Sequence, residues 1–214
     1  MKKLIVITSL FVTLAGSVFG QGYFVFSGVK SQVWDCFTGP APRLDTSVNV
    51  AFLWGPSTAT PLVDSLMGST PTNGVTPPFD LSTAWTDILL DPNFHFATNA
   101  SSSFIAVTAT SNTGSIGYND GAYFPVLGTT AEGTYAVFMI SWDAAYADPV
   151  AASQGVSPLG WGSVFTYGSA ALTSTPNAMN EPDFGTIGVP EPAALALAGL
   201  GAFALLLFRR CRQS

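Results

Sequence analysis

Histidine and cysteine, the side chains that most often act as catalytic bases and nucleophiles, are scarce in this chain. His95 is the single histidine, and Cys36 and Cys211 are the only cysteines. A nucleophilic triad would need His95 beside Cys36 or a serine and an aspartate, and none of these residues stands in a recognisable nucleophile context. The counts exclude a histidine cluster or a thiolate cage for a metal, and no carboxylate pair is singled out by spacing for glycoside hydrolysis. The sequence therefore predicts neither an enzyme nor a cofactor.

Oxygen-bearing side chains in two loops are the remaining metal candidates. Asp91, Asn93, Asn119 and Asp120 could surround a calcium ion, but the alternating spacing of an EF-hand-like loop is missing. Asp and Asn are also the ordinary residues of tight turns. Turn formation is the better explanation of all four residues, and calcium stays open only as an accessory to sugar binding.

Tryptophan supplies the most interesting side chains, because an exposed indole can stack on a sugar ring. Trp54, Trp142 and Trp161 lie in strong strand patterns, which favours burial in a core. Trp34 and Trp85 lie outside those patterns. They are the predicted candidates for a glycan-stacking platform.

The body of the chain, residues 21–188, must position these side chains, and its apolar residues alternate or come in short bursts between turn residues. This pattern predicts an all-β fold, an antiparallel, jelly-roll-like β-sandwich over residues 21–172. One short connector helix is expected from Asp148 to Gln154, with Asp148 as its cap and Pro149 in its first turn. Residues 173–188 are polar and contain proline, which predicts a linker. The predicted strands are 22–26, 48–54, 88–90, 94–96, 104–110, 135–142 and 161–167, and the predicted surface loops are 56–78 and 112–128.

The charge of this body limits its partners. All but one of the 13 acidic residues lie in it, whereas only Lys30 and Arg43 of the 7 basic residues do. Its formal charge is therefore about −10, which repels phosphate backbones and anionic lipid. The composition excludes nucleic acid as a partner and leaves neutral sugars and divalent cations admissible.

The N-terminus has the composition of a secretory signal peptide. Lys2 and Lys3 precede an apolar core from Leu4 to Leu14, and small residues follow up to Gly20. This order is typical of an export signal that is removed after translocation. Residues 1–20 are the predicted signal peptide, and Gln21 is the predicted mature start.

The C-terminus, residues 189–214, combines a proline motif, an apolar run and a basic end. Val189, Pro190, Glu191 and Pro192 form the motif, and residues 193–208 carry no charge. The run predicts a short transmembrane helix of roughly 24 Å against a hydrocarbon core of about 30 Å. Basic flanks stay on the cytoplasmic side, so the body is expected outside. The basic flank consists of Arg209, Arg210 and Arg212.

This arrangement resembles the PEP-CTERM sorting signal of exported bacterial proteins, which has such a motif, hydrophobic helix and basic end in the same order. The resemblance implies recognition by an exosortase-type membrane protease, which cleaves near the motif. The body is similar to exported proteins of verrucomicrobial and planctomycete type that carry this tail. That similarity rests on residues 21–24, 141–145 and 160–165, and it implies an all-β passenger with no particular activity.

Two functional hypotheses follow from these observations. The first is a structural or adhesive protein of the cell surface or extracellular polysaccharide matrix, transiently anchored in the inner membrane before it is released. The second is a carbohydrate-binding module with an aromatic platform, with or without calcium. The exposure of Trp34 and Trp85 is the feature that distinguishes them.

Overall fold

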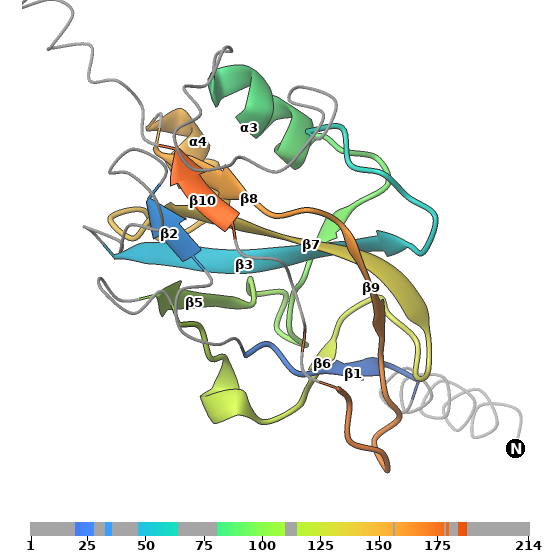
Figure 1. The fold of residues 1–214 in the computed structure, drawn as a ribbon. Coiled ribbons are helices and arrows are strands. Elements are labelled where there is room, and N and C mark those ends of the chain that lie inside the picture. Colours follow the sequence, from blue (N-terminus) through green and yellow to red (C-terminus); the bar gives the residue numbers. More distant parts are fainter. Residues whose placement is uncertain are drawn as a thin grey trace, which may run out of the picture.

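The computed structural model describes residues 20–27, 33–35, 47–63, 81–109, 115–155, 157–177, 179 and 184–187. Most regular structure in these residues is β-strand, and most strand pairs are antiparallel, which confirms the predicted all-β class (Figure 1). The predicted signal peptide, up to residue 19, and the segment 189–214 lie outside the described residues, as does Cys36.

Two long antiparallel strands form the centre of the fold. β3 (Val48–Pro56) pairs with β7 (Thr134–Asp143) along its whole length, from Val48 opposite Asp143 to Pro56 opposite Tyr135. Both strands are mostly apolar, and nearly every residue of β7 is buried. Strands of this composition suit the middle of a covered sheet. The predictions for 48–54 and 135–142 are confirmed.

Six shorter strands complete the eight-stranded sheet. The strand order along its main path is β2, β10, β8, β7, β3, β4, while β5 also pairs with β3 and β9 with β7. The single strand predicted over 161–167 is wrong, because β8 ends at Trp161 and β9 begins at Phe165, and the two contact opposite ends of β7. The shorter strands are β2 (Val33–Asp35), β4 (His95–Phe96), β5 (Ala106–Ala109), β8 (Leu159–Trp161), β9 (Phe165–Gly168) and β10 (Phe184–Ile187).

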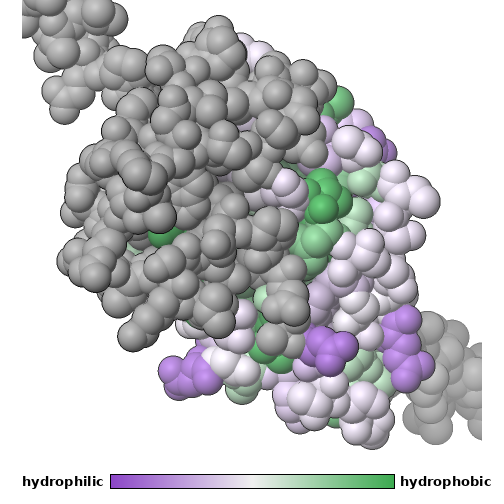
Figure 2. Space-filling model, viewed as in Figure 1, coloured by the Kyte–Doolittle hydropathy of each residue, from purple (hydrophilic) through white to green (hydrophobic). Residues whose placement is uncertain are grey.

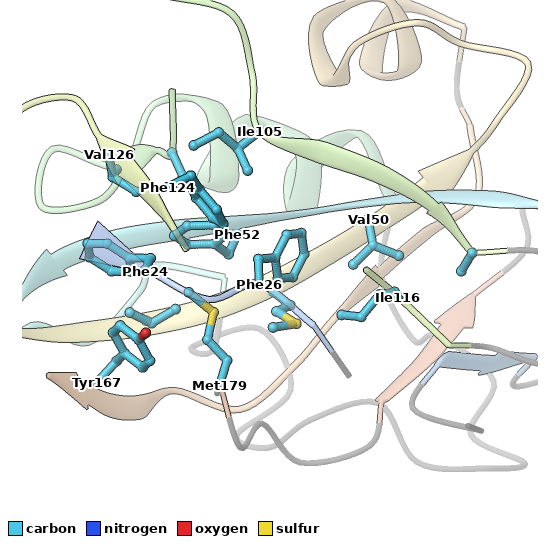
Figure 3. Packing of buried hydrophobic residues seen from close by; sticks show 14 of the residues in the cluster. Phe24, Phe26, Val50, Phe52, Ile105, Ile116, Phe124, Val126, Tyr167 and Met179 are labelled. Atoms are coloured by element: carbon cyan, nitrogen blue, oxygen red, sulfur yellow. The ribbon is translucent and has the colours of Figure 1, made fainter. Parts of the chain in front are cut away.

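A small second sheet covers one face of the large one. It consists of β1 (Gly22–Phe24) and β6 (Phe124–Val126), which are antiparallel. Figure 3 shows Phe24, Phe26, Phe52 and Phe124 gathered between the two sheets. β6 lies inside the predicted loop 112–128, so that prediction is wrong at its C-terminal end. β6 has only three residues and is flanked by turn residues, so the sequence pattern did not indicate a strand there.

Helices cover the opposite face. α3 (Leu81–Leu89) packs the buried side chains of Leu81, Ala84, Trp85 and Ile88 toward the sheet. Their spacing of three and four residues is that of one helix face. The strand predicted at 88–90 is therefore wrong, because a short apolar burst at the end of a helix resembles a strand when it is read alone.

α4 (Pro149–Gln154) is the predicted connector helix and is confirmed. The Asp148 side chain accepts a hydrogen bond of 2.8 Å from the Ala151 N–H, and Pro149 stands in the first turn. This is the usual way in which an Asp N-cap and an N-terminal proline begin a helix. The helices α3 and α4 cover this face of the large sheet. The small sheet of β1 and β6 therefore packs only against the opposite face.

Candidate functional site: the C-terminal strand and the exposed aromatic pair

The last strand of the sheet lies in the segment predicted to be a linker. β10 runs parallel to β2, with Phe184 opposite Val33, and antiparallel to β8, with Ile187 opposite Leu159. It therefore occupies an interior position between two strands. The prediction of a linker over 173–188 is wrong at 184–187, which form β10, so the paired strands extend beyond residue 172 to Ile187.

The chain just before β10 is also fastened to the core. Met179 is 2% exposed, and its N–H donates to the Val25 carbonyl at 3.4 Å. The Tyr167 hydroxyl accepts from the Val25 N–H at 3.0 Å and donates to the Asn177 carbonyl at 2.8 Å. Burial raises the pKa of Tyr167 above its usual value, an effect that the Val25 hydrogen bond partly offsets. One tyrosine thus joins the first strand region to the segment that leads to β10.

The N-terminal boundary of the fold lies next to the predicted mature start. The Gly22 N–H donates to Thr129 Oγ1 at 3.1 Å, and the Ala131 N–H donates to the Gly20 carbonyl at 2.8 Å. A Cβ on Gly22 would lie 2.6 Å from the Thr130 carbonyl oxygen, so only glycine fits this close approach. The sheet thus begins one residue after Gln21.

The burial of the tryptophan side chains differs in part from the prediction. Trp85 is 2% exposed, and its Nε1–H donates to the Ser157 carbonyl at 3.3 Å. It packs in the core under α3, so its predicted role as an exposed stacking platform is wrong. Trp142 and Trp161 are buried as predicted. For Trp34 the structure describes only the backbone, which pairs with Gly185 in β10, so its stacking role stays a prediction.

The polar candidates occupy three separate places. His95 is exposed and lies beside the half-buried Trp54, with ring centroids 5.4 Å apart. The Asp91 carboxylate accepts from the Leu62 and Asn93 N–H groups, both at 2.8 Å, which explains it as a loop and turn residue. Asn119 and Asp120 stand in a tight turn with φ of 53° each. Among the described residues, no three histidine, cysteine or acidic side chains gather around a possible metal position.

Sequence reasoning missed one pair of surface aromatics. The rings of Tyr23 and Tyr123 meet edge to face, with centroids 5.7 Å apart, and Tyr123 is 43% exposed. Tyr23 alternates with the buried Gly22 and Phe24 in β1, so its side chain is on the outer face of the small sheet. That alternation was readable in the sequence, whereas the contact with Tyr123 was not.

Comparison with known proteins adds one finding, at the end of the chain. The family model of the PEP-CTERM protein-sorting motif matches residues 188–212, directly after β10. No curated protein and no solved structure gives a significant match. Within the described part of the chain, no helix has the length and apolar character of a membrane span, and the predicted span 193–208 lies outside that part. The motif indicates an exported protein that is processed by an exosortase, a membrane enzyme, and the chain is therefore a PEP-CTERM sorting domain-containing protein whose last described strand, β10, ends directly before the motif.

Proposed function

We propose that this protein is a non-enzymatic component of the cell surface or extracellular matrix, structural or adhesive in role, which is anchored transiently by residues 193–208 and then released by exosortase. The observation that carries the proposal is the position of the sorting motif, which begins at residue 188 directly after the last strand. Cleavage near the motif breaks one peptide bond. With water as the acceptor, its hydroxyl goes to the carbonyl carbon and its hydrogen to the leaving amine.

The character of the domain supports a role outside the cell. Only 9% of the whole chain is charged, and the described surface in Figure 2 shows few strongly hydrophilic side chains. The acidic balance of the body disfavours nucleic acid and anionic lipid. A sparsely charged β-domain suits contact with neutral material such as extracellular polysaccharide.

Processing at both ends is the direct test of this proposal. We expect the cell-surface form to begin at or near Gln21 and to lack the chain beyond the motif at 189–192. Intact mass and terminal peptides of the protein isolated from the producing cell measure both ends. Recovery of a peptide that reaches Phe208 from the surface form would instead indicate a permanent anchor and contradict release.

A carbohydrate-binding role is the second candidate, and the Tyr23–Tyr123 pair favours it. Both side chains come from the outer face of the small sheet or the turn beside it, and Tyr123 exposes much of its ring. Exposed aromatic rings with a polar tip suit stacking on neutral sugars. Trp34 remains the other candidate platform.

Glycan retention of single variants tests this role. If the tyrosine pair forms the platform, Tyr123→Ala should weaken retention on neutral glycans roughly 2- to 10-fold, the effect of losing one aromatic contact of about 0.5–1.5 kcal/mol. Phe104→Ala is the matched control, because Phe104 is an exposed aromatic whose ring contacts Phe96 rather than the tyrosine pair. Trp34→Ala is measured in parallel. Unchanged retention in both Tyr123→Ala and Trp34→Ala would remove the aromatic-platform hypothesis.

A further inference from the structure

β10 is held on both of its edges. Thr186 lies opposite Gly160 of β8 on one side and opposite Asp35 of β2 on the other. In the part of the chain that the structure describes, β2 pairs with no other strand. β10 is therefore the only described link between β2 and the sheet, as the order of strands in Figure 1 shows.

The sorting motif follows this strand without a spacer. Ile187 is the last paired residue, and the family match begins at residue 188. A fully extended chain spans at most about 3.6 Å per residue, so the Cα of Glu191 can be no more than about 14 Å from that of Ile187. The motif Val189 to Pro192 is therefore separated by only one residue, Gly188, from the last paired residue of β10.

A bound protease and the sheet would compete for the same backbone groups. Proteins that bind extended peptides commonly do so by adding the peptide as a strand, which uses its N–H and C=O groups. In β10, Phe184 and Gly185 pair with β2, Ile187 pairs with β8, and Thr186 pairs with both strands. A protease that pairs with the backbone groups already used in the sheet can therefore bind residues 184–187 only if β10 separates from β2 or β8.

We propose that β10 stays in the sheet while the chain is sorted, so that the fold restricts the exosortase to bonds after Ile187 and the released domain keeps β10 and β2. This inference rests on the proposed processing at the motif. It also sets an order of events, because β10 pairs in parallel with a strand about 150 residues earlier. The sheet is complete only after almost the whole body has been exported and folded. Only then are the peptide bonds before Ile187 protected from the exosortase.

The test compares two threonine-to-proline variants of the full chain in the producing cell. Thr186→Pro removes an N–H and inserts a ring in a strand with neighbours on both sides, which should expel β10. Thr175→Pro is the control, because Thr175 is exposed, outside any strand and beside Pro176. We expect one C-terminus at or after Ile187 in the parent and the control, and additional ends before Ile187 in Thr186→Pro. A Thr186→Pro product with the same single end as the parent would overturn the proposal.

Two measurements on the parent chain keep the test decisive if Thr186→Pro fails to fold. Hydrogen exchange of the unprocessed protein should show the β10 amides protected to the level of β8, and a parent product that ends before Ile187 would contradict the inference. If the C-terminal segment is never removed, the proposed processing is wrong. In that case, fast hydrogen exchange of the β10 amides would show that β10 is not paired in the sheet and would overturn the inference. Slow exchange would support the pairing of β10 with β2 and β8.

Discussion

Phe138→Ala is expected to lower the free energy of unfolding by about 3–5 kcal/mol, because it removes a large buried side chain and leaves a cavity. Phe138 lies in β7, is 0% exposed, and its ring meets that of Phe94 edge to face at 5.0 Å. It lies on the face of the central sheet that α3 and α4 cover. A loss of this size is a large fraction of the roughly 5–15 kcal/mol of a typical domain, so the variant should unfold at a much lower urea concentration than the parent.

Urea unfolding of the domain comprising residues 21–187 measures this effect. Leu172→Ala is the control, because Leu172 is 50% exposed and its truncation should change the free energy of unfolding by no more than about 0.5 kcal/mol. Equal urea midpoints for the parent and Phe138→Ala would mean that Phe138 is not buried between the sheet and the helices α3 and α4.

Trp85→Ala should also destabilise the domain by about 3–5 kcal/mol. The indole packs between α3 and the sheet, and its Nε1–H satisfies the Ser157 carbonyl in the segment between α4 and β8. Truncation would leave a cavity and remove the hydrogen bond between α3 and the segment that joins α4 to β8. Trp85→Phe should recover part of the loss, because it refills much of the volume without the N–H donor.

Thermal and urea unfolding of Trp85→Ala are compared with those of Thr83→Ala, an exposed position on the same helix whose change should be within about 0.5 kcal/mol. Glycan retention is measured on the same samples. Normal stability combined with lost retention in Trp85→Ala would contradict the core position and restore the stacking role predicted from the sequence.

Local signals in the sequence identified the targeting segment and several elements correctly. The Val189 to Pro192 motif, the apolar run and the arginines form a contiguous pattern, which the family match confirms. β7 was predicted because both of its faces are apolar, β3 because Val48, Val50, Phe52 and Trp54 line one face, and α4 because Asp148 and Pro149 stand at its start. Each of these signals is contained in fewer than about 30 neighbouring residues, so no knowledge of distant contacts was needed.

The structure of β10 and α3 and the burial of Trp85 depend instead on contacts between segments that are far apart in the sequence. Residues 184–187 are strand because β2 and β8 supply partners for their backbone, and backbone hydrogen bonds leave no signature in side-chain composition. Likewise, Ile88 is helical because its face with Leu81, Ala84 and Trp85 covers an otherwise open side of the sheet. Trp85 is buried for the same reason. The sequence alone determined where the protein is sent and which strands form its centre, whereas the tertiary structure determined where the domain ends and which aromatic rings remain at its surface, because both depend on which distant segments supply partners.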